Sequence, residues 1–107
     1  MNGKDESVRL KKVPREKAFY FFTSIGNYIG ESASSLDEFL EKIEKIDAKA
    51  LDFHLYRGDF ERWLSQVLYD EKLAEEVKKL REQGLAGENL RKQLCAVVSK
   101  HLQETHV

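Results

Sequence analysis

The chain has 107 residues, which is the size of one domain and is long enough to bury a core without disulfides or metals. Charged residues make up 35% of it and hydrophobic residues 41%, a balance typical of a charge-rich globular protein. The formal net charge of −1 excludes a global basic field that would draw the whole protein to nucleic acid.

The single cysteine, Cys95, excludes an internal disulfide framework and is typical of a reducing compartment. Its apolar helical surroundings in the sequence predict a buried, inert thiol. No stretch approaches the roughly 20 apolar residues of a membrane span, and no signal-peptide core is visible. We therefore expect a cytoplasmic protein without membrane contact. The abundance of Lys and Glu is also compatible with a thermophilic source.

The first part of the chain differs from the rest. Residues 1–17 are polar, lack periodicity and contain the only proline, which predicts a flexible basic arm. Residues 18–105 are expected to form a single helical domain with an N-terminal strand. Although the whole chain is nearly neutral, residues 8–25 contain several basic residues and only one acidic residue.

Aromatic and β-branched residues dominate positions 18–25, which favours an extended strand. Gly26 and Asn27 are turn residues, residues 28–29 are expected to pair back as a short second strand, and residues 30–34 are expected to form a loop. An unpaired strand leaves a row of backbone groups without hydrogen-bond partners. Residues 28–29 are a short partner for a strand over residues 18–25. A second copy of the chain is the other candidate, so we expect a homodimer through residues 18–25.

From residue 35 onward, apolar residues recur at helical spacing and predict about five short helices. Polar caps begin these helices and glycines end them. The predicted caps and stops are Ser35, Asp47, Asp59 and Asp70, and Gly58 and Gly84. Short links and the absence of sustained heptads predict a mainly α fold: a compact bundle of about five short helices preceded by an N-terminal β-strand or short hairpin.

Three segments carry a resemblance to a known family: residues 26–30 (GNYIG), 35–39 (SLDEF) and 53–64 (FHLYRGDFERWL). The chain resembles an uncharacterised prokaryotic, largely archaeal family of small helical domains of unknown function, over about residues 18–83. The resemblance implies a recognition or regulatory module and transfers no catalytic residue. Where it implies a glycine before Asp70, this chain has Tyr69.

One cluster within the third segment suggests chemistry. Its members are His54, Arg57, Asp59 and Trp63. A His–Asp pair can act as a general base with its orienting group. However, Asp59 is predicted to cap a helix, and His54 shares a helix face with leucines. We interpret the cluster as a structural corner between two helices. An enzyme centred on His54 and Asp59 is the least favoured function, because no nucleophile motif accompanies the pair.

The sequence contains no pattern typical of a metal or cofactor site. The three histidines are far apart, and neither a closely spaced His pair nor a Cys pair is present. Residues 26–30 contain two glycines but lack the Lys-Ser/Thr that follows a phosphate-binding loop. We therefore expect no metal, no cofactor and no catalytic residue.

The strongest functional indication is the basic arm beside the aromatic strand. The candidate binding residues are Lys11, Lys12, Arg15, Lys17, Tyr20 and Phe22. Basic side chains neutralise phosphates, while exposed aromatic rings stack on bases or anchor protein partners. The favoured function is a non-enzymatic, homodimeric interaction module that binds a protein partner. The alternative is an RNA- or ribosome-associated factor that uses the arm. It also remains open that the strand is buried on both faces and the arm is merely solvated.

Overall fold

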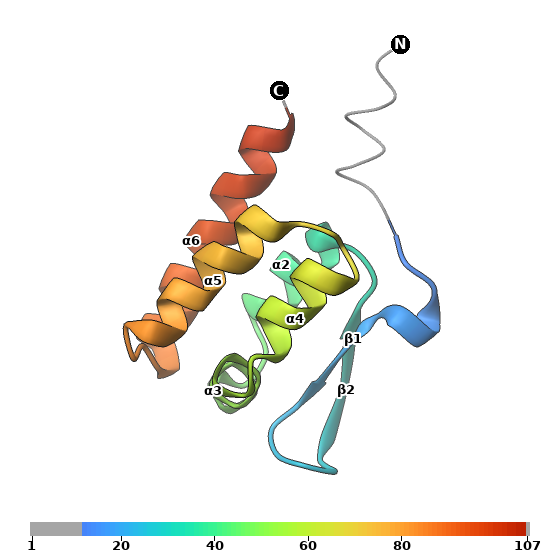
Figure 1. The fold of residues 1–107 in the computed structure, drawn as a ribbon. Helices are drawn as coiled ribbons and strands as arrows, with labels where there is room; N and C mark the ends of the chain where they lie inside the picture. Colours follow the sequence, from blue (N-terminus) through green and yellow to red (C-terminus); the bar gives the residue numbers. More distant parts are fainter. Residues whose placement is uncertain (1–11, 107) are drawn as a thin grey trace.

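The computed structural model describes residues 12–106 and confirms the predicted fold class. Within this range, a short 3-10 turn precedes two strands and five helices (Figure 1). The elements are η1 (Arg15–Lys17), β1 (Phe19–Phe22), β2 (Tyr28–Ala33), α2 (Leu36–Ile43), α3 (Ala48–Arg57), α4 (Asp59–Gln66), α5 (Glu71–Glu82) and α6 (Gly87–His106).

The two strands form an antiparallel hairpin that packs against the helices. The predicted loop at residues 30–34 is wrong, because residues 30–33 belong to β2. Gly30, at φ 80°, lies where the register shifts between the pairs Tyr20–Ser32 and Phe22–Tyr28. A glycine within a strand often marks a bulge, so the strand continues past it instead of ending.

Within the chain, β2 supplies the partner that β1 needs. The homodimer through residues 18–25 stays a prediction. The apparent lack of a partner for this strand, which suggested the dimer, does not apply, because β1 is paired with β2. Side chains alternate along β1 as the pleat requires. Phe19 and Phe21 are buried in the core, whereas Tyr20 and Phe22 are half-buried on the other face.

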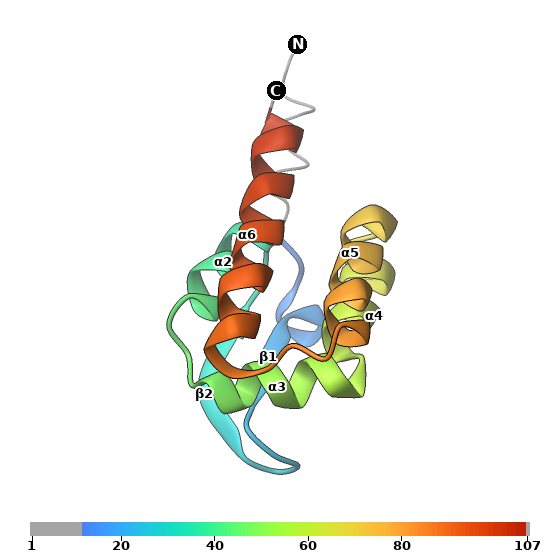
Figure 2. The same ribbon diagram turned by 90° about the vertical axis from the view of Figure 1, so that its left-hand side faces the viewer.

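The helices form one continuous hydrophobic core with the inner face of the hairpin. Helix α6 contacts α2, α3 and α5, and Figure 2 shows it running between α2 and α5. Helices α3 and α2 contact β1 and β2 respectively. The largest fully buried side chains are Phe21, Phe39, Phe60, Ile43, Leu51, Leu55, Leu64, Leu73, Leu90, Leu94, Val77 and Val98.

Three of the predicted caps are present. Ser35, Asp47 and Asp70 accept hydrogen bonds from the backbone N–H groups of the helices that follow them. The fourth prediction is wrong, because Asp59 is the first residue of α4 and makes no capping bond. Gly58 occupies the cap position and, at φ 77°, adopts the left-handed conformation that favours glycine. Because this one residue joins α3 to α4, the Asp59 carboxylate is left available to the side chains around the corner.

The junction between α4 and α5 contains the one non-glycine residue with positive φ in residues 12–106. It is Tyr69, at φ 56°, and its side chain is 73% exposed. This is the position at which the family resemblance implies a glycine. The backbone there has the left-handed conformation that glycine adopts without steric cost.

Within residues 12–106, no helix combines the length and the apolar character needed to cross a membrane.

Candidate binding cleft

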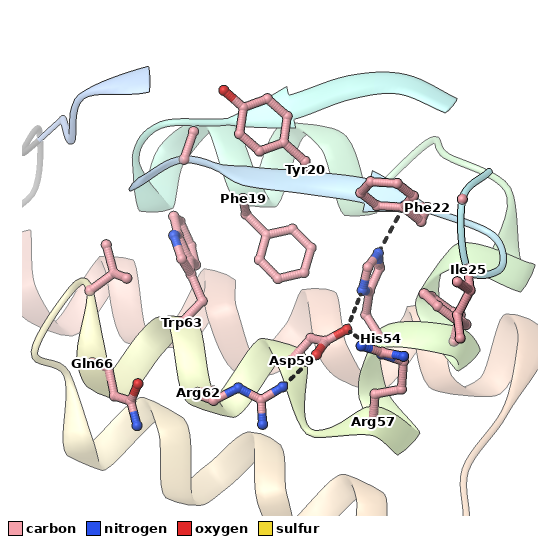
Figure 3. A pocket seen from close by; sticks show the side chains of 14 residues that line it. Phe19, Tyr20, Phe22, Ile25, His54, Arg57, Asp59, Arg62, Trp63 and Gln66 are labelled. Carbon is pink, nitrogen blue, oxygen red and sulfur yellow. Dashed lines mark hydrogen bonds and ion pairs between the residues drawn. The ribbon is translucent and has the colours of Figure 1, made fainter. Parts of the chain in front are cut away.

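A cleft of about 460 Å³ lies between β1 on one side and α3 and α4 on the other. We call it the β1–α4 cleft. Figure 3 shows the hairpin residues along its upper edge and the charged residues of the helical corner below. Its lining includes Phe19, Tyr20, Phe22 and Ile25 from the hairpin, and Phe53, His54, Arg57, Asp59, Arg62, Trp63 and Gln66 from the helices.

His54 joins β1 to the helical corner. Its Nε2 atom accepts a hydrogen bond from the Phe22 backbone N–H at 2.8 Å, and its Nδ1 atom lies 2.8 Å from Asp59 Oδ2. Because a backbone N–H only donates, Nε2 is the acceptor and the ring proton resides on Nδ1. Both nitrogens are therefore occupied, and neither is free to take a proton from a bound molecule or to hold a metal ion.

Asp59 is the centre of the corner. Besides His54, its carboxylate accepts hydrogen bonds from Arg57 Nε at 3.1 Å and from Arg62 Nη2 at 2.6 Å. The Asp59 side chain is 17% exposed, whereas Arg57 and Arg62 are 48% and 53% exposed. With His54 neutral, one carboxylate balances two guanidinium groups, so the cleft has an excess positive charge.

Much of the hydrogen-bonding capacity of the two guanidinium groups is unused. A guanidinium has five N–H donors, and among residues 12–106 Arg57 and Arg62 donate only to Asp59. Arg57 also lies over the ring of Phe53, 5.0 Å from its centroid, where a cation–π interaction holds it at the cleft. An anionic group entering the cleft therefore finds oriented donors in place.

Trp63 of α4 forms a hydrogen bond with the segment that precedes β1. Its indole Nε1–H donates to the Lys17 carbonyl at 2.8 Å, and the Tyr20 hydroxyl donates to the Arg15 carbonyl at 2.6 Å. Residues 15–17, which the sequence places in the basic arm, thus lie against the domain. The corner residues His54, Arg57 and Asp59 meet directly, while Trp63 lies one helical turn further along α4.

The predicted basic binding residues do not gather at the cleft. Lys12 pairs with Glu38 of α2, with Nζ 3.1 Å from Oε2. Arg15 and Lys17 are exposed and do not line the cleft, and Lys11 lies outside the described residues. Of the five candidates that the structure describes, Tyr20 and Phe22 line it.

Sequence reasoning missed Arg62, Phe53 and Gln66 as cleft residues. A signal for Arg62 was present, because it lies three residues after Asp59 on the same helix, the spacing of a helical ion pair.

Cys95 lies outside the cleft, is half-buried, and has its pKa raised by burial. In the part of the chain that the structure describes, no three His, Cys, Asp or Glu side chains gather as metal ligands would.

Burial and hydrogen bonding shift the pKa values of the corner. Burial lowers the pKa of His54 below its ordinary 6.5 and outweighs the opposing effect of Asp59. Burial alone would raise the pKa of Asp59, but hydrogen bonds from His54 and Arg57 hold it below its ordinary 3.8. Both groups therefore favour the neutral His54 and ionised Asp59 that the geometry requires.

These shifts predict acid destabilisation in two stages. Since the folded protein disfavours protonated His54, its contribution to stability is full above about pH 6.5 and is lost as the pH falls towards the lowered pKa. The contribution of Asp59 is full above pH 3.8 and is lost below it. Thermal melts should show the melting temperature falling as the pH is lowered from 6.5 in wild type, and less steeply in His54→Gln. Equal slopes for the two proteins would contradict this assignment.

Together, the fold and the cleft define a small, mainly α domain with an N-terminal β-hairpin and a cationic, aromatic-lined cleft. The sequence matches the family of unknown function DUF5752 over residues 14–107, and the chain belongs to this family. The match confirms the resemblance to an uncharacterised domain family, while the archaeal source stays a prediction. Comparison with curated proteins and with solved structures found no match.

Proposed function

We propose that this protein is a non-enzymatic interaction module that binds a protein partner through the β1–α4 cleft. The observation that carries the proposal is the pairing of an apolar, aromatic wall with two arginines that outnumber the single carboxylate between them. Binding sites are typically concave, mostly apolar and equipped with a few oriented polar groups. The volume of about 460 Å³ is within the usual range for such sites.

A binding role is favoured over a catalytic one by the chemistry of the lining. His54 has no free nitrogen, because Phe22 and Asp59 occupy both. The described residues that line the cleft include no serine, threonine, cysteine or lysine. A covalent mechanism needs an activated nucleophile beside a free base, and neither is present among these residues.

A protein partner is favoured over RNA by the arrangement of the cations and the aromatic rings. Affinity for RNA rests on several unpaired cations that follow successive phosphates. Here Lys12 is paired with Glu38, and the two arginines of the cleft share one carboxylate. Tyr20 and Phe22 pack against Tyr28, with ring centroids 5.9 and 5.5 Å apart, and are half-buried. This leaves less of their faces for stacking on bases.

Filling the cleft should abolish partner binding. Gln66 is exposed at the end of α4 and lines the cleft, so Gln66→Trp is expected to occupy part of the cleft without disturbing the core. Gln93→Trp, on the exposed face of α6 and outside the cleft, is the matched control. The measurement is affinity capture from a lysate of the source organism followed by mass spectrometry, with and without nuclease.

A partner that survives nuclease, binds wild type and Gln93→Trp, and is lost with Gln66→Trp would support the proposal. Equal capture by all three proteins, or no nuclease-resistant partner specific to wild type, would contradict it. Capture that nuclease removes would favour the RNA alternative.

A further inference from the structure

The lining of the β1–α4 cleft runs along two elements. It includes residues between Ala18 and Phe22, in and just before β1, and between Asp59 and Val67, in and just after α4. Helix α4 has eight residues, which at 1.5 Å per residue corresponds to about 12 Å. Four residues of extended chain span about 13 Å. A short extended segment therefore matches the length of the cleft.

One edge of β1 faces this cleft. Within residues 12–106 the sheet has two strands, and β2 covers one edge of β1. The Thr23 N–H donates to the Asn27 carbonyl across the hairpin, whereas the Phe22 N–H donates away from it to His54. Backbone groups alternate between the two edges of an antiparallel strand, so Tyr20 and Phe22 present theirs to the same edge. The bond from Phe22 to His54 shows that this is the edge next to the cleft. Such an edge is a template for another strand.

The charge of the cleft indicates what that strand carries. Arg57 and Arg62 exceed Asp59 by one positive charge, and their remaining donors are arranged in planar forks. A carboxylate matches this geometry with two parallel hydrogen bonds. Apolar side chains of the same segment would meet Phe22 and Trp63.

We propose that the ligand of the β1–α4 cleft is an extended, acidic peptide segment that adds to β1 as a third strand. Its backbone hydrogen-bonds to the edge at Tyr20, and the carboxylate of an Asp or Glu side chain binds Arg57 and Arg62. This inference rests on the proposed function and names the chemical class of the partner segment.

The test begins with selection of random heptapeptides displayed on phage against the wild-type protein. The selected peptides should share an acidic residue flanked by β-branched or aromatic residues. A synthetic peptide of the selected consensus should bind Arg62→Gln about tenfold more weakly, or worse, because a charge-assisted hydrogen bond is lost. Lys92→Gln removes an exposed positive charge from α6, outside the cleft, and should bind like wild type.

Strand addition has its own readout. The exchange of the Tyr20 amide hydrogen should slow when the consensus peptide binds, while the Lys92 amide serves as an internal reference. Absence of enriched peptides, a consensus without an acidic residue, or unchanged exchange at Tyr20 would each overturn the inference. Binding of polyuridylate that Arg62→Gln abolishes, with no peptide binding, would overturn it in favour of RNA.

The two proposals fail differently. If no acidic peptide is selected but Gln66→Trp still loses its nuclease-resistant lysate partner, the cleft binds a partner by another chemistry and only the peptide inference is overturned. If Gln66→Trp captures the same proteins as wild type, the proposed function is overturned together with the peptide inference.

Discussion

Replacing Trp63 by alanine is expected to lower the free energy of unfolding by about 3–5 kcal/mol, the usual effect of truncating a large buried aromatic residue. Trp63 is buried, with its ring centroid 5.6 Å from that of Phe19 and 5.5 Å from that of Phe39. Its indole N–H also donates to the Lys17 carbonyl, so the variant loses the hydrogen bond that holds the residues before β1 against α4. A loss of this size is a large fraction of the stability of a small domain.

Trp63→Phe separates packing from hydrogen bonding. It keeps an aromatic ring in the core but removes the indole N–H, and we expect a loss of about 1–3 kcal/mol. Because Trp63 is the only tryptophan, urea unfolding should be followed by circular dichroism and not by its fluorescence. Tyr56→Phe, which removes an exposed hydroxyl bond to the Leu85 carbonyl, is the control for a surface hydrogen bond. Equal losses for the alanine and phenylalanine variants would mean that packing of the ring contributes little.

The second large effect is expected at His54. His54→Leu should lower the free energy of unfolding by about 2–4 kcal/mol, because it leaves the half-buried Phe22 N–H and the Asp59 carboxylate without their ring partners. His101→Leu is a matched control. His101 is also buried, but among the described residues its ring has a single side-chain partner, Asp70, with Nε2 2.6 Å from Oδ2. Its replacement should cost less, on the order of 1–2 kcal/mol.

The ring of His54 can be checked directly. Long-range ¹H–¹⁵N correlation spectra at neutral pH should show His54 neutral, with its proton on Nδ1. Urea unfolding of the two leucine variants then compares the stabilities. A protonated His54, a proton on Nε2, or a smaller loss for His54→Leu than for His101→Leu would contradict the proposed network.

Local sequence signals predicted the helical part of the fold well. Ser35, Asp47 and Asp70 have side chains that bond to backbone groups two or three residues away, so their role needs no information from the rest of the chain. Apolar spacing likewise reflects which face of each helix is buried. The predicted loop after Gly30 was wrong, because glycine occurs both in turns and in β-bulges, and the local sequence does not tell them apart. The pairing of β2 with β1 shows that Gly30 lies in a bulge.

Asp59 illustrates a different limit. Judged from the local sequence, an aspartate near the start of a helix is a good N-cap. The residue that follows α3 has the left-handed backbone conformation, however, and glycine adopts it more readily than aspartate. The cap position therefore falls on Gly58, and the Asp59 carboxylate turns to His54, Arg57 and Arg62. The choice between these roles depends on how two helices meet, which local spacing does not encode.

The sequence by itself determined the mainly α class, the number of helices and most of their ends, because these depend on contacts within a few residues. It also placed His54, Arg57, Asp59 and Trp63 in one candidate cluster. Only the tertiary structure decided that β2 pairs with β1, that both His54 nitrogens are occupied, and that the positive charge of the cleft comes from Arg57 and Arg62. The hydrogen bond between Phe22 of β1 and His54 of α3 joins residues 32 apart in the chain, so only the packing of the chain brings them together.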